Sequence, residues 1–285
     1  MNPWIDTLFS NEALRRLVEQ IHTLPSLPAI YRELRDELRS PDPSIDKAAR
    51  IIAKDMGMVT KILQVVNAPF FGLSTKISNP VQAVAFLGLD RLKALVLSMQ
   101  VFSQFRGTRL AFFSLEVLWR HSLATGGHAR AIAKEEKAQP QVIDDAFTAG
   151  LLHDVGILVL ITNLPEKYTD ALALMQDRGI AEWEAEYEAL GATHGEVGGY
   201  LLANWGLEGP IVEAVSYHHD PMRSVSQPFS PLAAVHVANA VDEEQHESDL
   251  GGIPTPLDTA YLAACGLADR PRTWRAVRRG AVVLS

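Results

Sequence analysis

Histidine side chains are concentrated in the later part of this chain, where their spacing could bring several imidazoles around a metal ion. Of the nine histidines, His22 stands alone in the first 120 residues and the rest follow. Imidazoles and a carboxylate from different helices are donors that iron, manganese and zinc accept, and two such ions can activate a water for hydrolysis. The candidate ligands, in chain order, are His121 in WRHSLA, His153 and Asp154 in GLLHDVGILVL, His194 in THGEVGGYLL, and His218 and His219 in SYHHDP.

The pair His153–Asp154 interrupts an otherwise apolar run, residues 150–160. Burying a charged aspartate among Leu and Val side chains without a partner would cost several kcal/mol. Asp154 therefore requires a partner in the core. Two arrangements meet this requirement: a site that holds a divalent metal ion, or a metal-free polar cluster in which imidazoles hydrogen-bond the carboxylate directly.

Residues near the other histidines indicate close packing. Gly198 and Gly199 follow His194 by about one helical turn, and their missing side chains would let a neighbouring backbone approach closely. Successive residues of a helix differ by about 100° in direction. We therefore expect one of His218 and His219 to point inward and the other to lie at the rim of the site.

Nearly every long segment has the apolar spacing of a helix. In NEALRRLVEQIH, residues 11–22, Asn11 is a candidate N-cap, and the apolar residues follow the i, i+3, i+4, i+7 pattern of one buried stripe. Ser44 and Asp55 stand in the same position before two further helices, IDKAARIIAKD and MGMVTKILQVVNA. Alternating β-branched runs bounded by turn residues, which would indicate strands, are scarce. The sequence predicts an all-α fold.

A seam between two modules is predicted near residues 105–114, where Gly107 interrupts the helical pattern just before the histidine-rich part begins. We expect an N-terminal helical module over residues 1–106 and a second helical module, built around the polar site, over residues 107–285. A 47% hydrophobic share of 285 residues is enough for two cores. The second module carries a basic tail, which we interpret as a solvated helix end or a truncated linker. Its arginines are Arg270, Arg272, Arg275, Arg278 and Arg279.

The charge and the cysteine content exclude several classes of protein. A formal net charge of -8 argues against general nucleic-acid binding, which needs an excess of Lys and Arg. The single cysteine, Cys265, can form neither an intrachain disulfide nor a thiolate zinc site. We find no signal peptide pattern and no continuous apolar run of about 18 residues, so we expect neither export nor a membrane span, and we place the protein in the cytoplasm.

Six sequence blocks follow one another in a specific order: LPSLP at 24–28, IIAKDMGMVTKILQVVNAPFFG at 51–72, ISNPVQAVAFLGLDRLKALVL at 77–97, LWRHSLATG at 118–126, AFTAGLLHDVGILVL at 146–160 and HGEVGGYLLANWGL at 194–207. With the histidine order, they resemble the HDOD branch of the HD superfamily of metal-dependent phosphohydrolases, over roughly residues 15–245. The resemblance implies an all-helical fold with an HD-like half packed against the N-terminal half. It also implies a bacterial signalling role beside receiver and other regulatory domains.

The chain departs from the related phosphodiesterases that hydrolyse cyclic dinucleotides. Those proteins typically carry a lysine three residues after the HD aspartate, where this chain has Ile157, and a Gly-Tyr-Pro signature after the double histidine, where it reads HHDPMRSVSQP. The late Ala-Asp pair of the superfamily matches Ala238–Asn239, and a neutral asparagine is a poorer ligand for a hard cation. Asp242 or Asp220 could replace the missing aspartate geometrically.

We therefore expect a signalling output or scaffold domain of the HDOD type that contacts regulatory or signalling proteins and lacks catalytic activity. The departures at Ile157 and Asn239 both remove groups that would stabilise charge in a transition state. The alternative is a metal-dependent phosphohydrolase acting on a nucleotide or cyclic dinucleotide. The expected cofactor is a divalent iron, manganese or zinc ion, and the metal-free polar core stays open. Nucleic-acid binding through the arginine tail is a third, weaker hypothesis.

Overall fold

The chain folds into helices joined by short turns. The computed structural model describes residues 8–21, 25–68, 73, 75–105, 114–224, 228–250 and 253–282. Throughout these residues no strand is formed, so the predicted all-α fold is confirmed.

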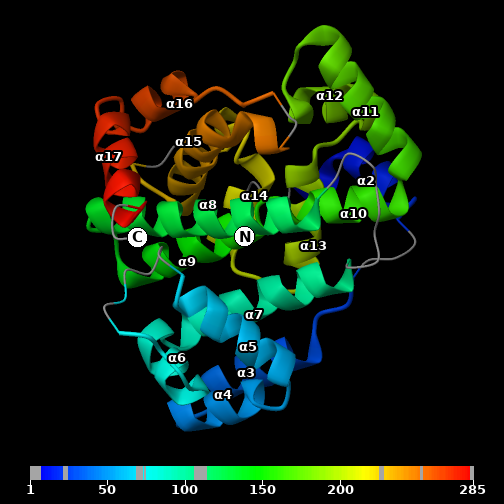
Figure 1. The fold of residues 1–285 in the computed structure, drawn as a ribbon. Coiled ribbons are helices and arrows are strands. Elements are labelled where there is room, and N and C mark those ends of the chain that lie inside the picture. Colours follow the sequence, from blue (N-terminus) through cyan, green and yellow to red (C-terminus); the bar gives the residue numbers. More distant parts are fainter. Residues whose placement is uncertain are drawn as a thin grey trace.

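Five helices form a bundle at one end of the molecule, drawn in blue to teal at the bottom of Figure 1. Their bounds are α3 Ala29–Leu38, α4 Ile45–Ile52, α5 Met56–Val66, α6 Pro80–Leu87 and α7 Leu89–Gln104. The last and longest of them, α7, joins the bundle to the rest of the protein, because the Ser98 hydroxyl donates a hydrogen bond to the Leu151 carbonyl across the interface (3.3 Å).

The remaining helices form a larger body above that bundle (Figure 1). α8 crosses its centre and packs on α9 and α15, α13 packs between α10 and α14, and α11 and α12 form a hairpin that projects at the top right. The bounds are α8 Leu115–Glu135, α9 Pro140–Leu152, α10 Val155–Asn163, α11 Pro165–Arg178, α12 Glu182–Leu190, α13 His194–Asn204, α14 Gly209–Tyr217, the short 3-10 helix η2 Pro221–Arg223, α15 Pro231–Leu250, α16 Thr259–Ala264 and α17 Pro271–Val282.

The predicted helix starts are confirmed by their caps. The side chains of Asn11, Ser44 and Asp55 each accept hydrogen bonds from backbone N–H groups in the first turn of α2 (Glu12–Val18), α4 and α5. α2 does not join the α3–α7 bundle but lies against α13 in the larger body (Figure 1). The expected module boundary at residue 106 falls in 106–113, outside the described residues, and stays a prediction.

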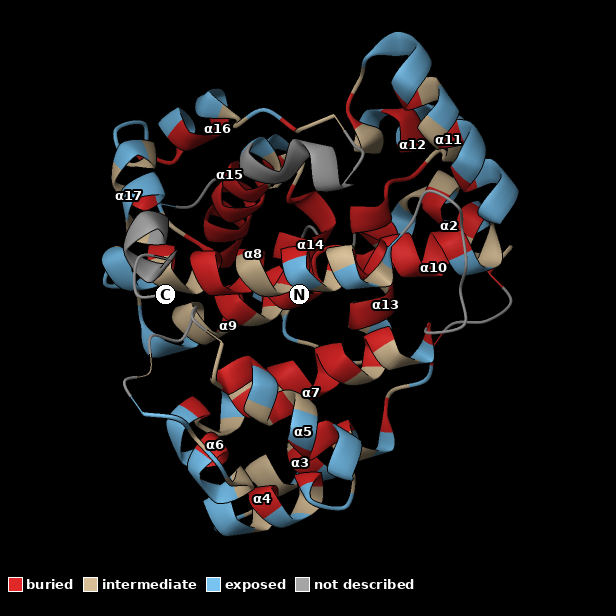
Figure 2. Ribbon diagram, in the orientation of Figure 1, coloured by how far each residue is buried: buried red, intermediate tan, exposed pale blue. Residues whose placement is uncertain are grey.

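Buried residues concentrate on the facing sides of α8, α9, α10, α13, α14 and α15 (Figure 2). By length and composition one segment, Pro140–Asn163, could cross a membrane, but 89% of its most apolar window is buried inside the protein. The turn at His153–Asp154 also divides this segment into α9 and α10. The segment is therefore the central layer of the core, and it carries the polar pair into the interior.

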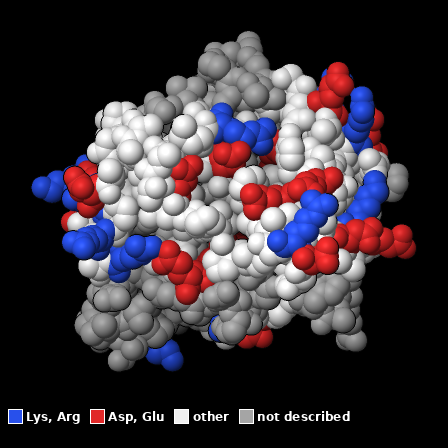
Figure 3. Space-filling model, turned by 90° about the horizontal axis from the view of Figure 1, so that it is seen from above, with Lys and Arg blue, Asp and Glu red and all other residues white. Residues whose placement is uncertain are grey.

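Surface charge on the face shown in Figure 3 is mixed, with basic and acidic side chains interspersed over the described residues. In the predicted basic tail, Arg270 pairs with Glu136, the residue that follows α8 (2.5 Å), and Arg275 pairs with Glu244 of α15 (2.6 Å). Trp274 buries α17 against the core, while Arg272 and Arg275 are exposed. The side chains of Arg278 and Arg279 lie outside the described residues.

Candidate metal centre

Glycines allow the helices that carry the candidate ligands to pack at backbone contact. A side chain at Gly156, two residues after Asp154, would overlap the carbonyl oxygen of His194. On α13, a Cβ at Gly198 would lie 3.1 Å from a Val155 side-chain carbon, and one at Gly199 would overlap the Ser216 hydroxyl. The predicted close approach at Gly198 and Gly199 is confirmed, and it presses the start of α13 against the His153–Asp154 turn.

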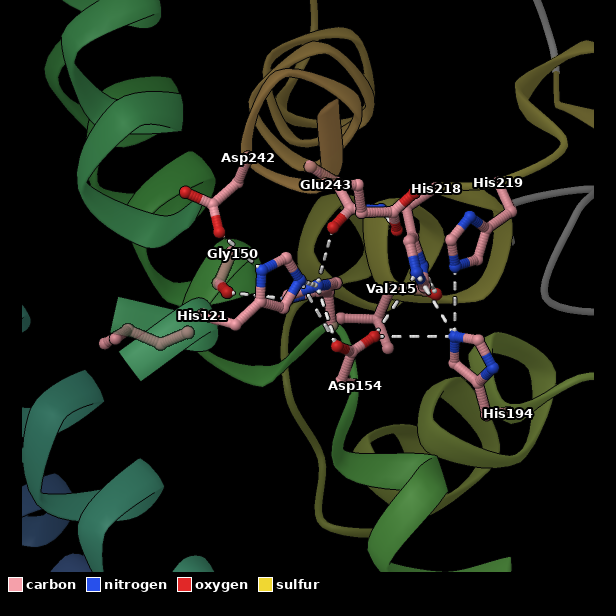
Figure 4. Close-up of polar contacts among 12 residues, drawn as sticks. His121, Gly150, Asp154, His194, Val215, His218, His219, Asp242 and Glu243 are labelled. Carbon is pink, nitrogen blue, oxygen red and sulfur yellow. Dashed lines mark hydrogen bonds and ion pairs between the residues drawn. The ribbon is translucent and has the colours of Figure 1, made fainter. Parts of the chain in front are cut away.

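The Asp154 carboxylate lies at the centre of the histidine cluster (Figure 4). Its Oδ2 is 3.1 Å from His153 Nε2 and 3.5 Å from His121 Nε2. Its Oδ1 is 3.4 Å from His194 Nε2 and 3.6 Å from His218 Nε2. One carboxylate thus faces two groups of imidazoles, one on each oxygen, and the partner that Asp154 requires is supplied by these rings.

His219 adds a fifth imidazole from the side of the site. It is half-buried, lines a hollow beside the cluster, and its ring stacks on Trp183 with an interplanar angle of 11°. This agrees with the expected rim position. Its Nε2 nevertheless reaches His194 Nε2 at 3.2 Å.

Four of the imidazoles are held by hydrogen bonds on the side away from Asp154. Because carboxylates and carbonyls only accept hydrogen bonds, each Nδ1 carries the hydrogen, and in a neutral ring each Nε2 presents a lone pair to the centre. Metal-bound histidines have this same arrangement of outer partners. The pairs are His121 Nδ1 with Asp242 (2.7 Å), His153 Nδ1 with the Gly150 carbonyl (2.9 Å), His194 Nδ1 with Glu186 (2.8 Å) and His218 Nδ1 with the Val215 carbonyl (2.8 Å).

The inward nitrogens lie at separations that fit a shared cation. The Nε2–Nε2 distances are 3.1 Å for His121 and His153, 3.4 Å for His194 and His218, and 3.2 Å for His194 and His219. Two ligand atoms bound at about 2.1 Å from a metal, at tetrahedral or octahedral angles, are separated by about 3.0–3.4 Å. Facing lone pairs repel unless a proton or a cation lies between them. The donor set and its spacing therefore fit divalent transition-metal ions.

Burial and neighbouring charges shift the protonation of the cluster in both directions. Burial, the largest influence, opposes the charge on His121, but its hydrogen bond to Asp242 and the charge of Asp154 prevail and raise its pKa to about 9. The pKa of His194 is likewise raised well above its usual value, against burial, by Glu186 and Asp154. Burial, aided by neighbouring positive imidazoles, lowers the pKa of His218 to about 3.

The central carboxylate is held in its charged form. Burial acts to raise the pKa of Asp154, but the charge of His153 and hydrogen bonds from His153, His194 and His218 hold that pKa well below its usual range. Burial and the neighbouring imidazoles also keep the pKa of His219 well below its usual value. The charged carboxylate and the neutral rings of His218 and His219 are in the state that a metal ion requires, whereas His121 and His194, whose pKa values are raised, would release a proton when a metal ion binds.

α15 carries Asn239, which stands at the position of the aspartate in the Ala-Asp pair of the superfamily. Asn239 Oδ1 lies 3.2 Å from His153 Nε2, so an oxygen does face the cluster, and its amide donates to Glu243 (2.7 Å). Asp242 binds the outer nitrogen of His121 and supports that ring instead of replacing the missing ligand. Asp220 lines the hollow beside His219. The suggested replacements therefore do not take the position of Asn239, and both stay outside the ring of inward donors.

Sequence reasoning missed the carboxylates of α12. Glu186, which is fully buried, accepts hydrogen bonds from both the backbone N–H and Nδ1 of His194, and its Oε1 has no hydrogen-bond partner among the described residues. Glu182, one turn earlier, binds the Tyr168 hydroxyl, and its pKa is raised to about 7 by burial and by Glu186. Glu186 stands eight residues before His194 with no motif around it, so the sequence carried no signal for this pairing.

The fold and the site together define a helical protein of the HD superfamily: a His-Asp pair in a turn between two core helices meets histidines from three other helices. A family model for the HDOD domain matches residues 24–221, and the chain belongs to the HDOD family. The family resemblance inferred from the six sequence blocks is thereby confirmed.

Comparisons with individual proteins agree on the fold. An HDOD domain protein of unknown function from Geobacter sulfurreducens is similar with a TM-score of 0.74 at 23% identity, over 99% of each chain. A proposed phosphohydrolase from Shewanella amazonensis SB2B is similar with a TM-score of 0.69 at 21% identity, over 96% of this chain and 98% of that one.

One curated relative matches in sequence, an uncharacterized protein of Treponema pallidum (strain Nichols), at 26% identity over 216 residues. The match covers 76% of this chain and 41% of the relative. This chain therefore spans about two-fifths of the length of that relative.

Proposed function

We propose that this chain is a regulatory HDOD domain whose histidine cluster binds one or two divalent transition-metal ions as a structural centre, and that it acts by contacting other signalling proteins without turning over a substrate. Iron, manganese and zinc fit the donor set. The observation that carries the proposal is the convergence of four Nε2 atoms on one buried carboxylate, with His219 in the same group of possible ligands. As a regulator that contacts other signalling proteins, the domain would work in the cytoplasm.

Charge at the site favours a cation. The described residues within or next to the cluster include the carboxylates of Asp154, Glu186, Asp242 and Glu243. Two protonated imidazoles offset only part of this charge, and a buried excess of negative charge is costly. The ions would be held by His121, His153 and Asp154 on one side and by Asp154, His194, His218 and His219 on the other.

Limited access argues against turnover. The side chains of His121, His153, Asp154, His194 and His218 are 0–8% exposed. The hollow that reaches His218 and His219 has a cavity volume of only about 10 Å³. Sites for drug-sized ligands enclose about 300–1,000 Å³, so a dinucleotide could not reach the cluster without movement of the helices around it.

The chain also lacks groups for charge stabilisation. Ile157, where active relatives carry a lysine, is buried among apolar residues and offers no donor to a phosphate oxygen. Asn239 contributes a neutral oxygen where a carboxylate would strengthen the hold on a metal ion. A bound ion in this setting would stabilise the fold and shape a surface that a partner recognises.

The second candidate function, a metal-dependent phosphohydrolase, is favoured by one observation. The two oxygens of Asp154 face separate groups of imidazoles, which is the arrangement of a carboxylate shared by two ions. Two ions supply Lewis acidity and lower the pKa of water, which suits a nucleotide or cyclic dinucleotide substrate. On this reading, the chain would position the substrate from the hollow beside His219.

Turnover distinguishes the two functions. We would incubate Mn²⁺-, Fe²⁺- and Zn²⁺-loaded protein with cyclic and linear dinucleotides and mononucleotides, and use Asp154→Asn as the background. We expect no product above that background. A matched double variant, Ile157→Lys with Asn239→Asp, tests whether the missing groups alone account for inactivity. Product formed by the wild type and lost in Asp154→Asn would replace the scaffold proposal with the hydrolase.

A further inference from the structure

The segment before α3 runs as a strap along the helix that carries His194. We call residues 8–21, which include α2, the N-terminal strap. Its Phe9 ring packs on Tyr200 of α13 with centroids 5.2 Å apart, and Lys167 of α11 donates a hydrogen bond to Gln20 (2.5 Å). The strap is therefore attached to the larger body, although the chain continues from it into the α3–α7 bundle.

One buried carboxylate joins the strap to both segments that bear the inward histidines. Glu196, 1% exposed, accepts hydrogen bonds from the Asn11 amide (3.2 Å) and from the Arg223 guanidinium (2.9 Å) on one oxygen. Its other oxygen accepts the Thr193 backbone N–H (3.0 Å). Thr193 immediately precedes His194, and Arg223 lies in η2 just after the double histidine. These three donors together satisfy the buried charge.

The strap is held by packing as well as by this hydrogen bond. α2 has only seven residues, so it is marginal in isolation, and the strap has four buried apolar side chains, Leu8, Leu14, Leu17 and Ile21. A short element at the edge of the fold opens more readily than the core. The far end of α13 is tied to the same stretch of chain, because the Trp205 indole N–H donates to the Pro25 carbonyl (3.2 Å) just before α3. Movement of the α3–α7 bundle would therefore act on both ends of α13.

We propose that the N-terminal strap regulates the metal centre. When docked, it holds Glu196, and through it the His194 and His218–His219 segments, in the arrangement that binds metal. Release of the strap, by displacement of the α3–α7 bundle or by a protein that takes up the strap, loosens both segments and weakens metal binding. Since coupling between two sites is reciprocal, bound metal also tightens the strap. This regulation rests on the proposed metal centre.

The test is the variant Asn11→Ser. Serine still caps α2, so the helix start is kept, but its short side chain cannot reach Glu196. The matched control is Glu12→Ala on the same helix, where the side chain is 80% exposed and pairs only with Arg16 in the described contacts. Two quantities are measured: amide hydrogen exchange without metal, and the Zn²⁺ dissociation constant determined by chelator competition.

In Asn11→Ser we expect amide exchange to rise in residues 8–21 and also in 193–196 and 218–223, and Zn²⁺ binding to weaken about five-fold or more. Glu12→Ala should match the wild type. Faster exchange confined to 8–21, or unchanged Zn²⁺ binding, would overturn the regulation. A wild type that takes up no Zn²⁺ would instead overturn the metal centre, and exchange at 193–196 and 218–223 would still decide whether the strap is coupled to the histidine segments.

Discussion

Replacing Asn239 with aspartate should have opposite effects on the metal-free and the metal-loaded protein. The side chain is 2% exposed, its oxygen faces His153 Nε2 at 3.2 Å, and its amide donates to Glu243 at 2.7 Å. Aspartate keeps the oxygen toward the cluster but cannot donate to Glu243. Without metal, the variant therefore places a third acidic group beside Asp154 and Glu243.

The size of the metal-free effect follows from these contacts. A lost hydrogen bond to a charged group costs about 1.5–3 kcal/mol, and like-charge repulsion adds to it, so we expect Asn239→Asp to lower the free energy of unfolding by about 2–4 kcal/mol. For a chain of this size that corresponds to a fall in Tm of about 3–7 °C. With metal, the new carboxylate is a stronger ligand, and each tenfold gain in affinity returns about 1.4 kcal/mol.

Differential scanning calorimetry with EDTA and with saturating Mn²⁺ measures both effects. We expect Asn239→Asp to melt below the wild type in EDTA and to show a larger Mn²⁺-dependent rise in Tm. Asn204→Asp is the matched control, since Asn204 is exposed on α13 and bonds only the Tyr200 carbonyl in the described contacts. A variant that is as stable as wild type in EDTA, or one with no larger Mn²⁺ effect, would refute the placement of Asn239 beside a metal.

Three further predictions concern the surroundings of the site. Glu186→Gln should lower Zn²⁺ affinity about 10–100-fold, because the charge that orients His194 is lost while the hydrogen-bond shape is kept; chelator competition measures it. Gly156→Ala should lower the free energy of unfolding, measured with urea, by about 3 kcal/mol, because the added methyl group would overlap the His194 carbonyl. The control Gly57→Ala should lower it much less, because a methyl group there meets only the end of the Asp55 side chain. Burial raises the pKa of Asp145 to about 6, so the contribution of this group to stability is present below pH about 4 and is lost as the pH rises through 6. The stability of Asp145→Asn relative to wild type, measured by urea unfolding, should therefore rise from pH 5 to pH 7.5. A stability difference that stays constant over this range would contradict the raised pKa.

The sequence was informative where local chemistry decides the structure. Asn11, Ser44 and Asp55 cap helices as expected because an N-cap needs only its own first turn. Gly198 and Gly199 mark close packing because a missing side chain at helical spacing opens one face. The histidine order identified the family, and the six expected ligands lie together in space.

Contacts that depend on tertiary placement could not be predicted in the same way. Glu186 meets His194 because the α11–α12 hairpin folds over the start of α13, and no pattern around Glu186 reports that turn. His219 meets His194 just beyond the end of α14, and helix ends are the least certain part of a structure predicted from sequence. Asn11 was recognised as a cap, but its second role, donating to Glu196, requires knowing which helix lies beside α2.

The metal content of untagged protein, purified without added metal, tests the central claim most directly. Elemental analysis of the wild type beside Asp154→Ala should find close to one or two equivalents of iron, manganese or zinc in the wild type and none in the variant, because the variant removes the carboxylate that both groups of imidazoles face. A well-folded wild type without metal, or metal that persists in Asp154→Ala, would contradict a metal centre at this cluster and would leave a scaffold with a hydrogen-bonded polar core.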